Sequence, residues 1–469
     1  MEVRTSVPPA ADIDQPLAAL RVELGLPSAF PADALAEATA ATWDMTGRFD
    51  ARDLELVTLD PLGSRDRDQA FVIERRGAGH RVNYAIADVG AFVRAGGAVD
   101  AEAHRRGETV YLPDGRVPLH PPVLSEGSAS LLPGEDRPAI LWRLDLDGDG
   151  EPTTVDVRRA VVRSRAQLDY ASFQQRQGDV FELLREVGER RLALERARGG
   201  VSLPVPEQQV DGDGTTWTLT FRATLPVEDW NAQLSLLTGM AAARLMLDAG
   251  VGLLRTMPPP PAHVVASLRR SALALGVEWP ASSSYPEVVR GLDASVPAQA
   301  AILRLASVLF RGAGYVAFDG TPPAQRTHSA VAAPYAHATA PLRRLADRYV
   351  SECCVAACAG VAPPEWARTG LPALPRLMAE ADQRAHAADR AVIEVAEALV
   401  LQHRVGEVFR GVVVEANPQR AEVQLADPAV RARLLGDGLE LGTVVNARLT
   451  TCDVARRQVE FTAVAGDGP

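Results

Sequence analysis

The pattern of apolar and polar positions divides the chain into stretches of helical and strand character. Residues 14–45 carry apolar side chains at helical spacing, with a break that makes two short helices. From 52 to 165, apolar and polar residues alternate in short runs, which predicts β-strands. Helical spacing returns over 170–200 and in several segments between 228 and 402, and the residues from 405 onward again predict short strands.

These stretches predict an α+β chain with three parts. A length of 469 residues exceeds the usual size of one core, so two or three domains are expected. We assign 51–404 to a main domain, with a buried helix at 228–250 because apolar residues cover most of its faces. Residues 405–469 place glycines between short strands, which predicts a small closed β-barrel of the OB type. Residues 1–50 form a helical segment, either a helix-turn-helix-like unit or an extension packed on the main domain.

The composition is that of a globular protein and excludes several classes. Apolar residues make up 47% of the chain, the N-terminus lacks the apolar core of a signal peptide, and no run of about 18 uncharged apolar residues could span a membrane. We therefore expect a cytoplasmic protein with no membrane partner, and a monomer is our working expectation for its oligomeric state, which these features do not determine. The four cysteines include no CxxC pair, so we interpret them as small buried residues rather than as a metal or redox site.

The charge balance bears on a nucleic-acid partner. A net charge of -11 normally argues against one, so any basic surface that binds phosphate has to be local. The chain contains no lysine, and all 49 basic residues are arginine. Lysine is therefore excluded as a catalytic base, and phosphate contacts fall to the forked guanidinium group of arginine.

Three aspartates stand close together in the segment "TLDPLGSRDRDQAF". Asp60 ends a predicted strand, and Asp66 and Asp68 are two residues apart, so they point to one face if the chain is extended there. Clustered carboxylates repel each other unless a cation neutralises them, and aspartate oxygens favour Mg²⁺ or Mn²⁺. Such sites serve phosphoryl transfer. The alternative is a solvated turn in which Arg65 and Arg67 compensate the acids.

A second acidic stretch, "DLDGDGEPTTVD" at 145–156, matches much of the spacing of a calcium-binding EF-hand loop. An EF-hand needs a helix on both sides, whereas the flanking segments here have strand character. We therefore interpret Asp-Gly-Asp-Gly as a hairpin turn. The similar "VDGDGTTWTLTF" at 210–221 is interpreted in the same way.

The segment "YAHATAPLRRLAD" at 335–347 carries two adjacent arginines. Thr339 can cap a helix whose first turn contains Pro341, which would place Arg343 and Arg344 beside a helix N-terminus, where anions bind. The pair is then a phosphate clamp. The alternative is two arginines on a solvated helical face.

Together these segments resemble the ribonuclease II/R family, whose RNB catalytic domain would cover about residues 50–400. Five segments match the motifs of the family in order: "TLDPLGSRDRDQAF", "YAIADV", "TVYLPDGRVPLHPPVLSEGSASLLPGEDRPA", "RARGGVSLPVPE" and "YAHATAPLRRLAD". The resemblance implies an RNB domain with a mixed sheet and surrounding helices, followed by an S1-type OB barrel. It also implies a processive 3′→5′ exoribonuclease that uses Mg²⁺ to hydrolyse single-stranded RNA to nucleoside 5′-monophosphates through a metal-activated water.

The resemblance also implies roles for individual residues. Asp60, Asp66 and Asp68 fall on three of the four catalytic, metal-binding aspartates of the family, and Arg343 falls on the arginine that contacts the phosphate near the scissile bond. Tyr111 falls on the aromatic residue that stacks on a base, a contact that tolerates any sequence. A tyrosine of the core is the alternative for this position.

The chain departs from the family pattern at several positions. Gln69 stands where the fourth aspartate is expected, and it can offer an amide oxygen to a metal or its water but no charge. We place Gln69 and Arg344 with the residues that bind substrate. Ala338, Ala340 and Leu345 replace usual residues around the arginine motif.

About 50 residues precede the RNB segment, which leaves no room for two N-terminal cold-shock barrels.

Two other hypotheses for the function remain open at this point. One is a catalytically impaired, RNA-binding relative with Gln69 as the lesion, and the other is a deoxyribonuclease.

Overall fold

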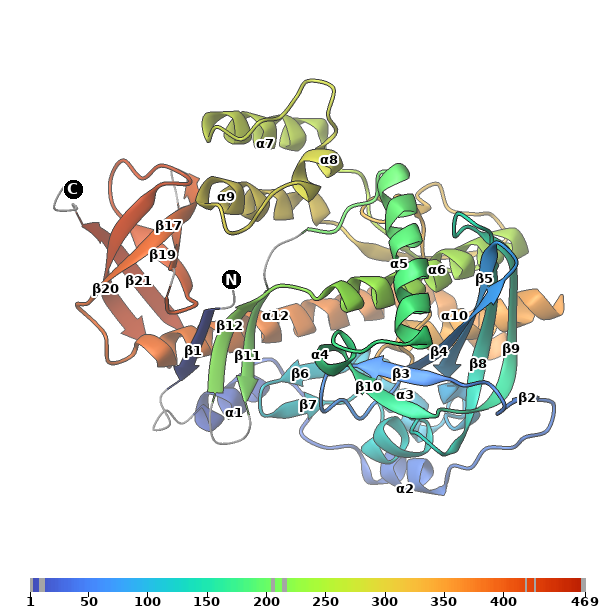
Figure 1. Cartoon of the computed structure of the whole chain (residues 1–469). Helices are drawn as coiled ribbons and strands as arrows, with labels where there is room; N and C mark the ends of the chain where they lie inside the picture. Colours follow the sequence, from blue (N-terminus) through green and yellow to red (C-terminus); the bar gives the residue numbers. More distant parts are fainter. Residues whose placement is uncertain are drawn as a thin grey trace.

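The structure, a computed structural model of the chain, has a main domain and a barrel at opposite ends of one long helix. It describes residues 3–7, 13–203, 207–212, 217–417, 420–425 and 427–464. The long helix α12 (Leu374–Leu401) runs from the main domain to the barrel (Figure 1). None of the described helices combines the length and the apolar character that crossing a membrane requires.

A mixed seven-stranded sheet forms the centre of the main domain. Its order is β10-β3-β4-β5-β8-β9-β2, with parallel pairing at the two outer pairs, β10 with β3 and β9 with β2, and antiparallel pairing between. The strands are β2 (Phe49–Ala51), β3 (Val57–Asp60), β4 (Gln69–Arg76), β5 (Gly79–Ala87), β8 (Asp136–Leu146), β9 (Pro152–Arg163) and β10 (Ala166–Asp169). The predicted α+β class with a mixed sheet is confirmed.

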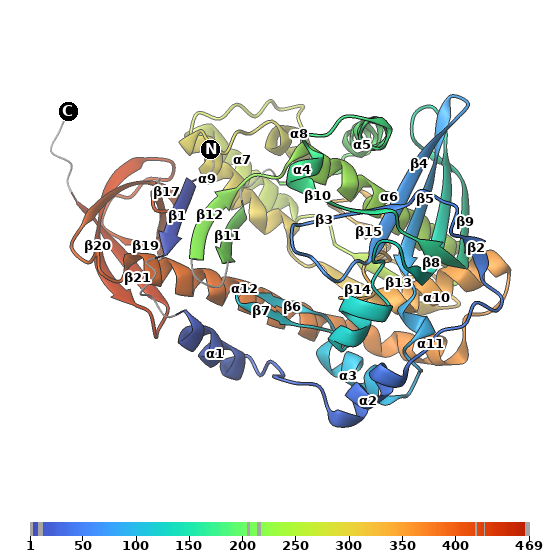
Figure 2. The same ribbon diagram turned by 60° about the horizontal axis from the view of Figure 1, so that its bottom comes forward.

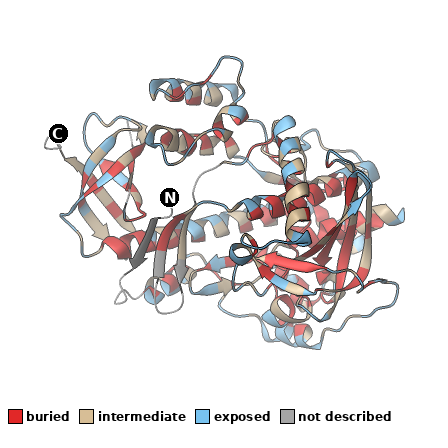
Figure 3. Ribbon diagram, in the orientation of Figure 1, coloured by how far each residue is buried: buried red, intermediate tan, exposed pale blue. Residues whose placement is uncertain are grey.

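Both faces of the sheet are buried, as the alternation along β5 requires. Val82, Tyr84 and Ile86 enter one core with α5 (Asp179–Ala197), α6 (Pro226–Ala249) and α10 (Leu345–Ala359), whereas Ala85 and Ala87 enter a second core with α2 (Ala32–Ala40) and α3 (Ala98–Arg106). Figure 3 shows the buried strands between these helices. Large side chains on one face and alanines on the other let the helices of the second face pack close to the sheet.

Helix α6 is buried on most sides, as its sequence predicts. Gly239 lies at its centre, where an added Cβ would come within 2.2 Å of the Tyr335 ring. The backbone of Ala336 donates to the Gly239 carbonyl at 3.1 Å. This close approach fixes the segment that leads to Arg343.

The remaining elements of the domain surround this core. They include α4 (Tyr170–Phe173), α7 (Ala262–Ala274), α8 (Tyr285–Arg290), α9 (Pro297–Ala306), α11 (Glu365–Gly370), and the pairs β6 (Val110–Leu112) with β7 (Gly115–Val117), β13 (Val251–Thr256) with β14 (Gly314–Asp319), and β15 (Thr327–His328) with β16 (Ala333–Pro334). The helices α7, α8 and α9 enclose a separate small core.

The two N-terminal helices do not form the helix-turn-helix-like unit considered above. Helix α1 (Asp14–Glu23) buries Leu17 and Leu20 against α12, and α2 packs on α3 (Figure 2). Each helix thus covers a different core, which corresponds to the alternative of an extension packed on the main domain. Strand β1 (Val3–Val7), which pairs with β12 (Trp217–Arg222), was not predicted.

Both acidic stretches join antiparallel strands. β8 and β9 pair on either side of 147–151, so the EF-hand-like spacing belongs to a hairpin, as predicted. β11 (Glu207–Gly212) pairs with β12 in the same way, although the predicted turn at 213–216 lies outside the described residues.

The C-terminal barrel is closed, in the order β17-β18-β19-β21-β20, which confirms the predicted OB-type fold. Its strands are β17 (Val408–Asn417), β18 (Arg420–Leu425), β19 (Arg431–Leu435), β20 (Val444–Asp453) and β21 (Gln458–Val464). Phe409 and Phe461 are buried inside it, with ring centroids 5.7 Å apart. These two aromatic rings are therefore unavailable for stacking on a base.

Glu397 of α12 joins the barrel to the rest of the molecule. Its Oε1 atom accepts hydrogen bonds from Gln208 Nε2 at 2.6 Å and from the backbone of Arg431 at 2.7 Å. The side chain is buried, and this burial raises the pKa of Glu397 to about 7. The folded protein therefore binds this proton more tightly than the unfolded chain does.

We expect the stability contributed at Glu397 to fall as the pH rises from about 4.5 to about 7, because the folded state then has to hold a buried charge. Glu397→Gln removes this dependence. Its free energy of unfolding relative to wild type should therefore increase between pH 5 and pH 8, by up to about 3 kcal/mol, and its melting temperature should rise accordingly. Glu380→Gln, on an exposed part of α12, is the control. A difference that does not change with pH would contradict the prediction.

Candidate functional site

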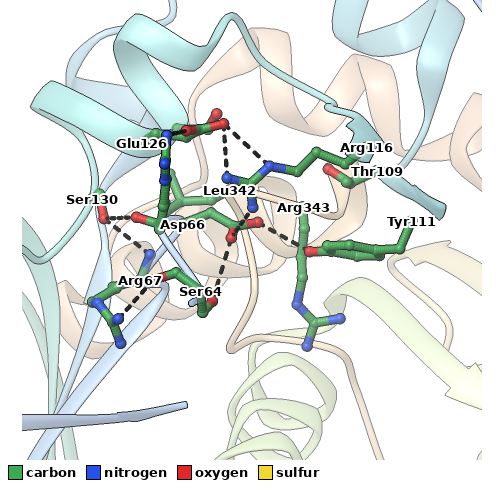
Figure 4. Close-up of polar contacts among 12 residues, drawn as sticks. Ser64, Asp66, Arg67, Thr109, Tyr111, Arg116, Glu126, Ser130, Leu342 and Arg343 are labelled. Atoms are coloured by element: carbon green, nitrogen blue, oxygen red, sulfur yellow. Dashed lines mark hydrogen bonds and ion pairs between the residues drawn. The ribbon is translucent and has the colours of Figure 1, made fainter. Parts of the chain in front are cut away.

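One cavity of about 1020 Å³ gathers most of the residues that the sequence singles out. Its wall comes from the connection between β3 and β4, the β6–β7 hairpin and the segment before α10. The predicted site residues that line it are Asp60, Asp66, Asp68, Gln69, Tyr111 and Arg343. Segments far apart in the sequence therefore meet at one place, and Figure 4 shows part of this wall.

The strand pattern explains where the acids lie. Asp60 is the last residue of β3, and Asp68 directly precedes β4, the antiparallel neighbour of β3. The loop between the two strands carries Asp66 toward the same cavity. Both strand ends therefore present carboxylates at one edge of the sheet.

Asp60 is balanced by one buried arginine. Arg67, 1% exposed, donates from Nη1 to Asp60 Oδ2 at 2.8 Å and from Nη2 to the Ser64 carbonyl at 2.6 Å. Burial nevertheless raises the pKa of Asp60 to about 6; Arg67 opposes this shift and the nearby Asp66 adds to it. The positive charge of Arg67 therefore does not fully offset the cost of burying this carboxylate.

Asp68 joins the acidic segment to the arginine segment. It is 4% exposed, its Oδ1 accepts a hydrogen bond from the backbone of Leu342 at 2.7 Å, and its Oδ2 lies 3.6 Å from Arg343 Nε. Burial raises the pKa of Asp68 well above its ordinary value, and the charge of Arg343 opposes this shift. Asp68 thus sets the position of Arg343 relative to Asp60.

Asp66 is already paired. Its Oδ2 accepts from the Tyr111 hydroxyl at 3.0 Å, its Oδ1 accepts from Arg116, and Ser64 Oγ lies 3.5 Å from Oδ1 (Figure 4). Within the described ranges, no three His, Cys, Asp or Glu side chains are grouped so as to hold a metal ion. The convergence of three ready metal ligands, predicted from spacing, is therefore not seen.

The donor set still suits a hard divalent cation. Asp60 and Asp68 are desolvated carboxylates with raised pKa values, and each has one arginine as partner. A cation with oxygen ligands would relieve this charge imbalance. Asp66 fits as a third ligand only if it exchanges Arg116 for the cation.

Gln69 is the first residue of β4, and its amide oxygen is occupied. Gln69 Oε1 accepts from the hydroxyl of Tyr84 and lies 3.4 Å from Ser235 Oγ. Tyr84 is fully buried, and its hydroxyl also lies 3.0 Å from Ser235 Oγ. Holding a metal through this oxygen, as the sequence suggested, would require giving up these contacts.

Tyr111 lies in the cavity wall rather than in the core. It is 46% exposed at the middle of β6, opposite Arg116 of β7, and its hydroxyl donates to Asp66. The alternative of a core tyrosine is therefore wrong. The ring and Arg343 both line the cavity.

The two adjacent arginines have different environments. Helix α10 begins at Leu345 rather than near Pro341. Asp347 Oδ1 accepts from the backbone of Ala340, residues 341–343 form turns, and Arg344 is extended and forms a β-bridge with Glu108. Arg344 donates to Asp347 at 2.5 and 2.9 Å, and Asp347 is fully buried. Arg343 is 43% exposed in the cavity. The expectation that both arginines contact substrate is thus corrected, since Arg344 is held in a buried ion pair.

Sequence reasoning missed four residues of the site, which are Tyr84, Arg116, Glu126 and Ser235. Arg116 and Glu126 lie in the motif segment that begins at Tyr111, and both line the cavity. An arginine five residues after an aromatic residue was the available signal for the first of them. Ser235 lies 166 positions from Gln69, and no local pattern connects the two.

Two protein families match the chain. The RNB domain matches residues 48–359, and the RNase II-type exonuclease C-terminal S1 domain matches residues 407–464. The chain belongs to the RNB family. These matches confirm the predicted ribonuclease II/R family with its exoribonuclease class, and the S1 type of the C-terminal barrel.

Ribonucleases R of two bacteria are similar to this RNB protein. The protein of Thermotoga maritima is 25% identical over 97% of the chain and 71% of its own length. The protein of Escherichia coli is 27% identical over 90% of the chain and 58% of its own length. The chain therefore corresponds to only part of the length of these relatives.

Solved structures share the fold of this RNB protein. RNase R of Mycoplasma genitalium, in complex with ribose methylated single-stranded RNA, has a TM-score of 0.86 at 17% identity, over 97% of this chain and 79% of that one. Yeast Ssd1, a pseudonuclease, has a TM-score of 0.71 at 16% identity, over 96% of this chain and 58% of that one. Because a pseudonuclease has the same fold, activity has to be argued from the site.

The contrast between the adjacent arginines predicts losses of stability of different size. Arg344→Gln leaves the buried Asp347 charge unpaired and should cost about 3–5 kcal/mol of unfolding free energy. Arg343→Gln removes a partly exposed group and should cost at most about 1 kcal/mol. Urea unfolding of both variants measures the difference, and equal losses would show that the two environments are not distinct.

Proposed function

We propose that this protein is a processive 3′→5′ exoribonuclease that hydrolyses single-stranded RNA to nucleoside 5′-monophosphates with Mg²⁺ or Mn²⁺. The observation that carries the proposal is the meeting of three aspartates, Arg343 and Tyr111 in one cavity. Binding alone does not require clustered acids, because they repel a polyanion. Membership of the RNB family and the ribonuclease R relatives support the same reaction.

Each residue of the cavity has a task in this reaction. Asp60 and Asp68 would hold the divalent cation, which supplies Lewis acidity toward the phosphate and the attacking water. Arg343 places a guanidinium beside Asp68, where it can neutralise charge that develops on the phosphate. The exposed ring of Tyr111 offers a face for a base, and such stacking accepts every base.

Single-stranded RNA is the substrate that the comparisons favour. The Mycoplasma genitalium structure with the same fold was solved with ribose methylated single-stranded RNA, and another was solved with double-stranded RNA. We carry only the single-stranded substrate to this chain, because Tyr111 requires an unpaired base. Only the membership of the RNB family argues against a deoxyribonuclease that cleaves DNA.

A second candidate is an RNA-binding relative with impaired catalysis. Gln69 favours it, because the amide brings no charge and its oxygen is engaged by Tyr84. The retention of Asp60, Asp68 and Arg343 in one cavity argues against it. The two candidates differ in whether any concentration of divalent cation permits cleavage.

We expect the purified protein with Mg²⁺ to shorten 5′-labelled single-stranded RNA from its 3′ end and to stop in EDTA. Asp68→Asn should lower the cleavage rate at least about 100-fold, because it removes a charged ligand from the cation site. Asp149→Asn, in the exposed β8–β9 turn, is the matched control and should leave the rate unchanged. Intact RNA at every Mg²⁺ and Mn²⁺ concentration would refute the proposal that the wild-type protein is an active exoribonuclease.

Gln69→Asp separates the two candidates. For an active enzyme, the added carboxylate should lower the Mg²⁺ concentration for half-maximal cleavage by roughly tenfold, because it adds a negative charge to the site. A Mg²⁺ titration of both proteins measures this shift. An inactive wild type whose Gln69→Asp variant cleaves RNA would identify the impaired relative.

A further inference from the structure

Two residues that face each other on the β6–β7 hairpin hold the same carboxylate. Tyr111 and Arg116 are directly opposed across the two strands. The Tyr111 hydroxyl donates to Asp66 Oδ2 at 3.0 Å, and Arg116 Nη1 donates to Oδ1 (Figure 4). The hairpin is thus attached to the acidic segment through both oxygens of one side chain.

Arg116 is held firmly in this place. Its Nη2 lies 2.7 Å from Glu126 Oε1, and its Nε donates to the same oxygen at 3.1 Å. Arg116 and Glu126 are each 19% exposed, and Arg65, which is 75% exposed, lies 3.7 Å from Glu126 on the outer side. Asp66, Arg116, Glu126 and Arg65 form a row of alternating charge along the cavity wall.

This row bears on Asp66 as a metal ligand. Each of its oxygens already accepts a hydrogen bond, Oδ1 from the guanidinium of Arg116 and Oδ2 from the hydroxyl of Tyr111. A divalent cation on Asp66 Oδ1 would stand in the place of the Arg116 Nη1 proton. Two positive groups at that distance repel strongly in a partly buried site, so one excludes the other.

We propose that Arg116 is a positioning residue that competes with the divalent cation for Asp66 and so sets the affinity of the site for the cation. Arg116 keeps Asp66 neutralised when the cation is absent, and Glu126 keeps the guanidinium at the wall when Asp66 turns to the cation. The inference rests on the proposed function in that the cation is the one the nuclease would use. It concerns binding of the cation, which is measured without RNA.

The test is titration of the full-length protein with Mn²⁺, followed by the electron paramagnetic resonance signal of the free ion. Arg116→Gln should bind Mn²⁺ roughly tenfold more tightly than wild type, because the competitor of the cation is gone. Arg65→Gln is the control, since it removes a positive charge from the same row but does not touch Asp66. Its affinity should change less than about twofold.

The double variant Asp66→Asn with Arg116→Gln identifies the route of the effect. If Arg116 acts through Asp66, the gain in affinity from Arg116→Gln disappears when Asp66 is already asparagine. A gain that persists there would mean a general effect of charge and would overturn the proposal. Unchanged or weaker binding by a folded Arg116→Gln protein would overturn it as well.

Arg116→Lys provides the same test if the glutamine variant does not fold. Lysine keeps the positive charge but lacks the fork that bridges two carboxylates, so a gain of about threefold is expected. Affinity equal to wild type would overturn the proposal. Because no RNA is present, an absence of nuclease activity leaves the result of this experiment intact, and the two failures are distinguishable.

Discussion

The site depends on one hydrogen bond between segments 274 positions apart. The backbone of Leu342 donates to Asp68, and this bond sets the arginine segment against the ends of β3 and β4. Because Asp68 is almost fully buried, its carboxylate needs this donor, and the partly exposed Arg343, 3.6 Å away, adds a weaker charge interaction. This bond acts together with the backbone hydrogen bond from Thr109 to the Arg343 carbonyl at 2.9 Å, and both hold the arginine beside the acids.

Local patterns predicted the elements well, because their causes are local. The alternation in "HRVNYAIADV" is a strand with two buried faces, and the apolar surface of the helix around Gly239 is a buried helix. Asp66 and Asp68, which their spacing placed on one face of an extended segment, both line the cavity. These features depend on neighbours within a few residues, so the sequence contains them directly.

The sequence could not predict the partners of the site residues. The pairing of Arg344 with Asp347 spans three residues and was missed because Thr339 and Pro341 suggested an earlier helix start. The contact of Gln69 with Tyr84 depends on strand register, and the neighbouring serine comes from α6. Whether a polar residue faces a substrate or a buried partner is decided by such tertiary contacts, which periodicity does not contain.

Helix α12 has a further consequence for the distance between the barrel and the cavity. One helix packs against β6, which carries Tyr111, and against β20 and β21 of the barrel. Its 28 residues make a rod of about 42 Å. One residue inserted into that rod would shift the barrel by about 1.5 Å and rotate it by about 100° about the helix axis. The separation and the relative orientation of the barrel and the cavity are therefore set together by the length of a single helix, which can change only by about whole turns if the barrel is to keep its orientation.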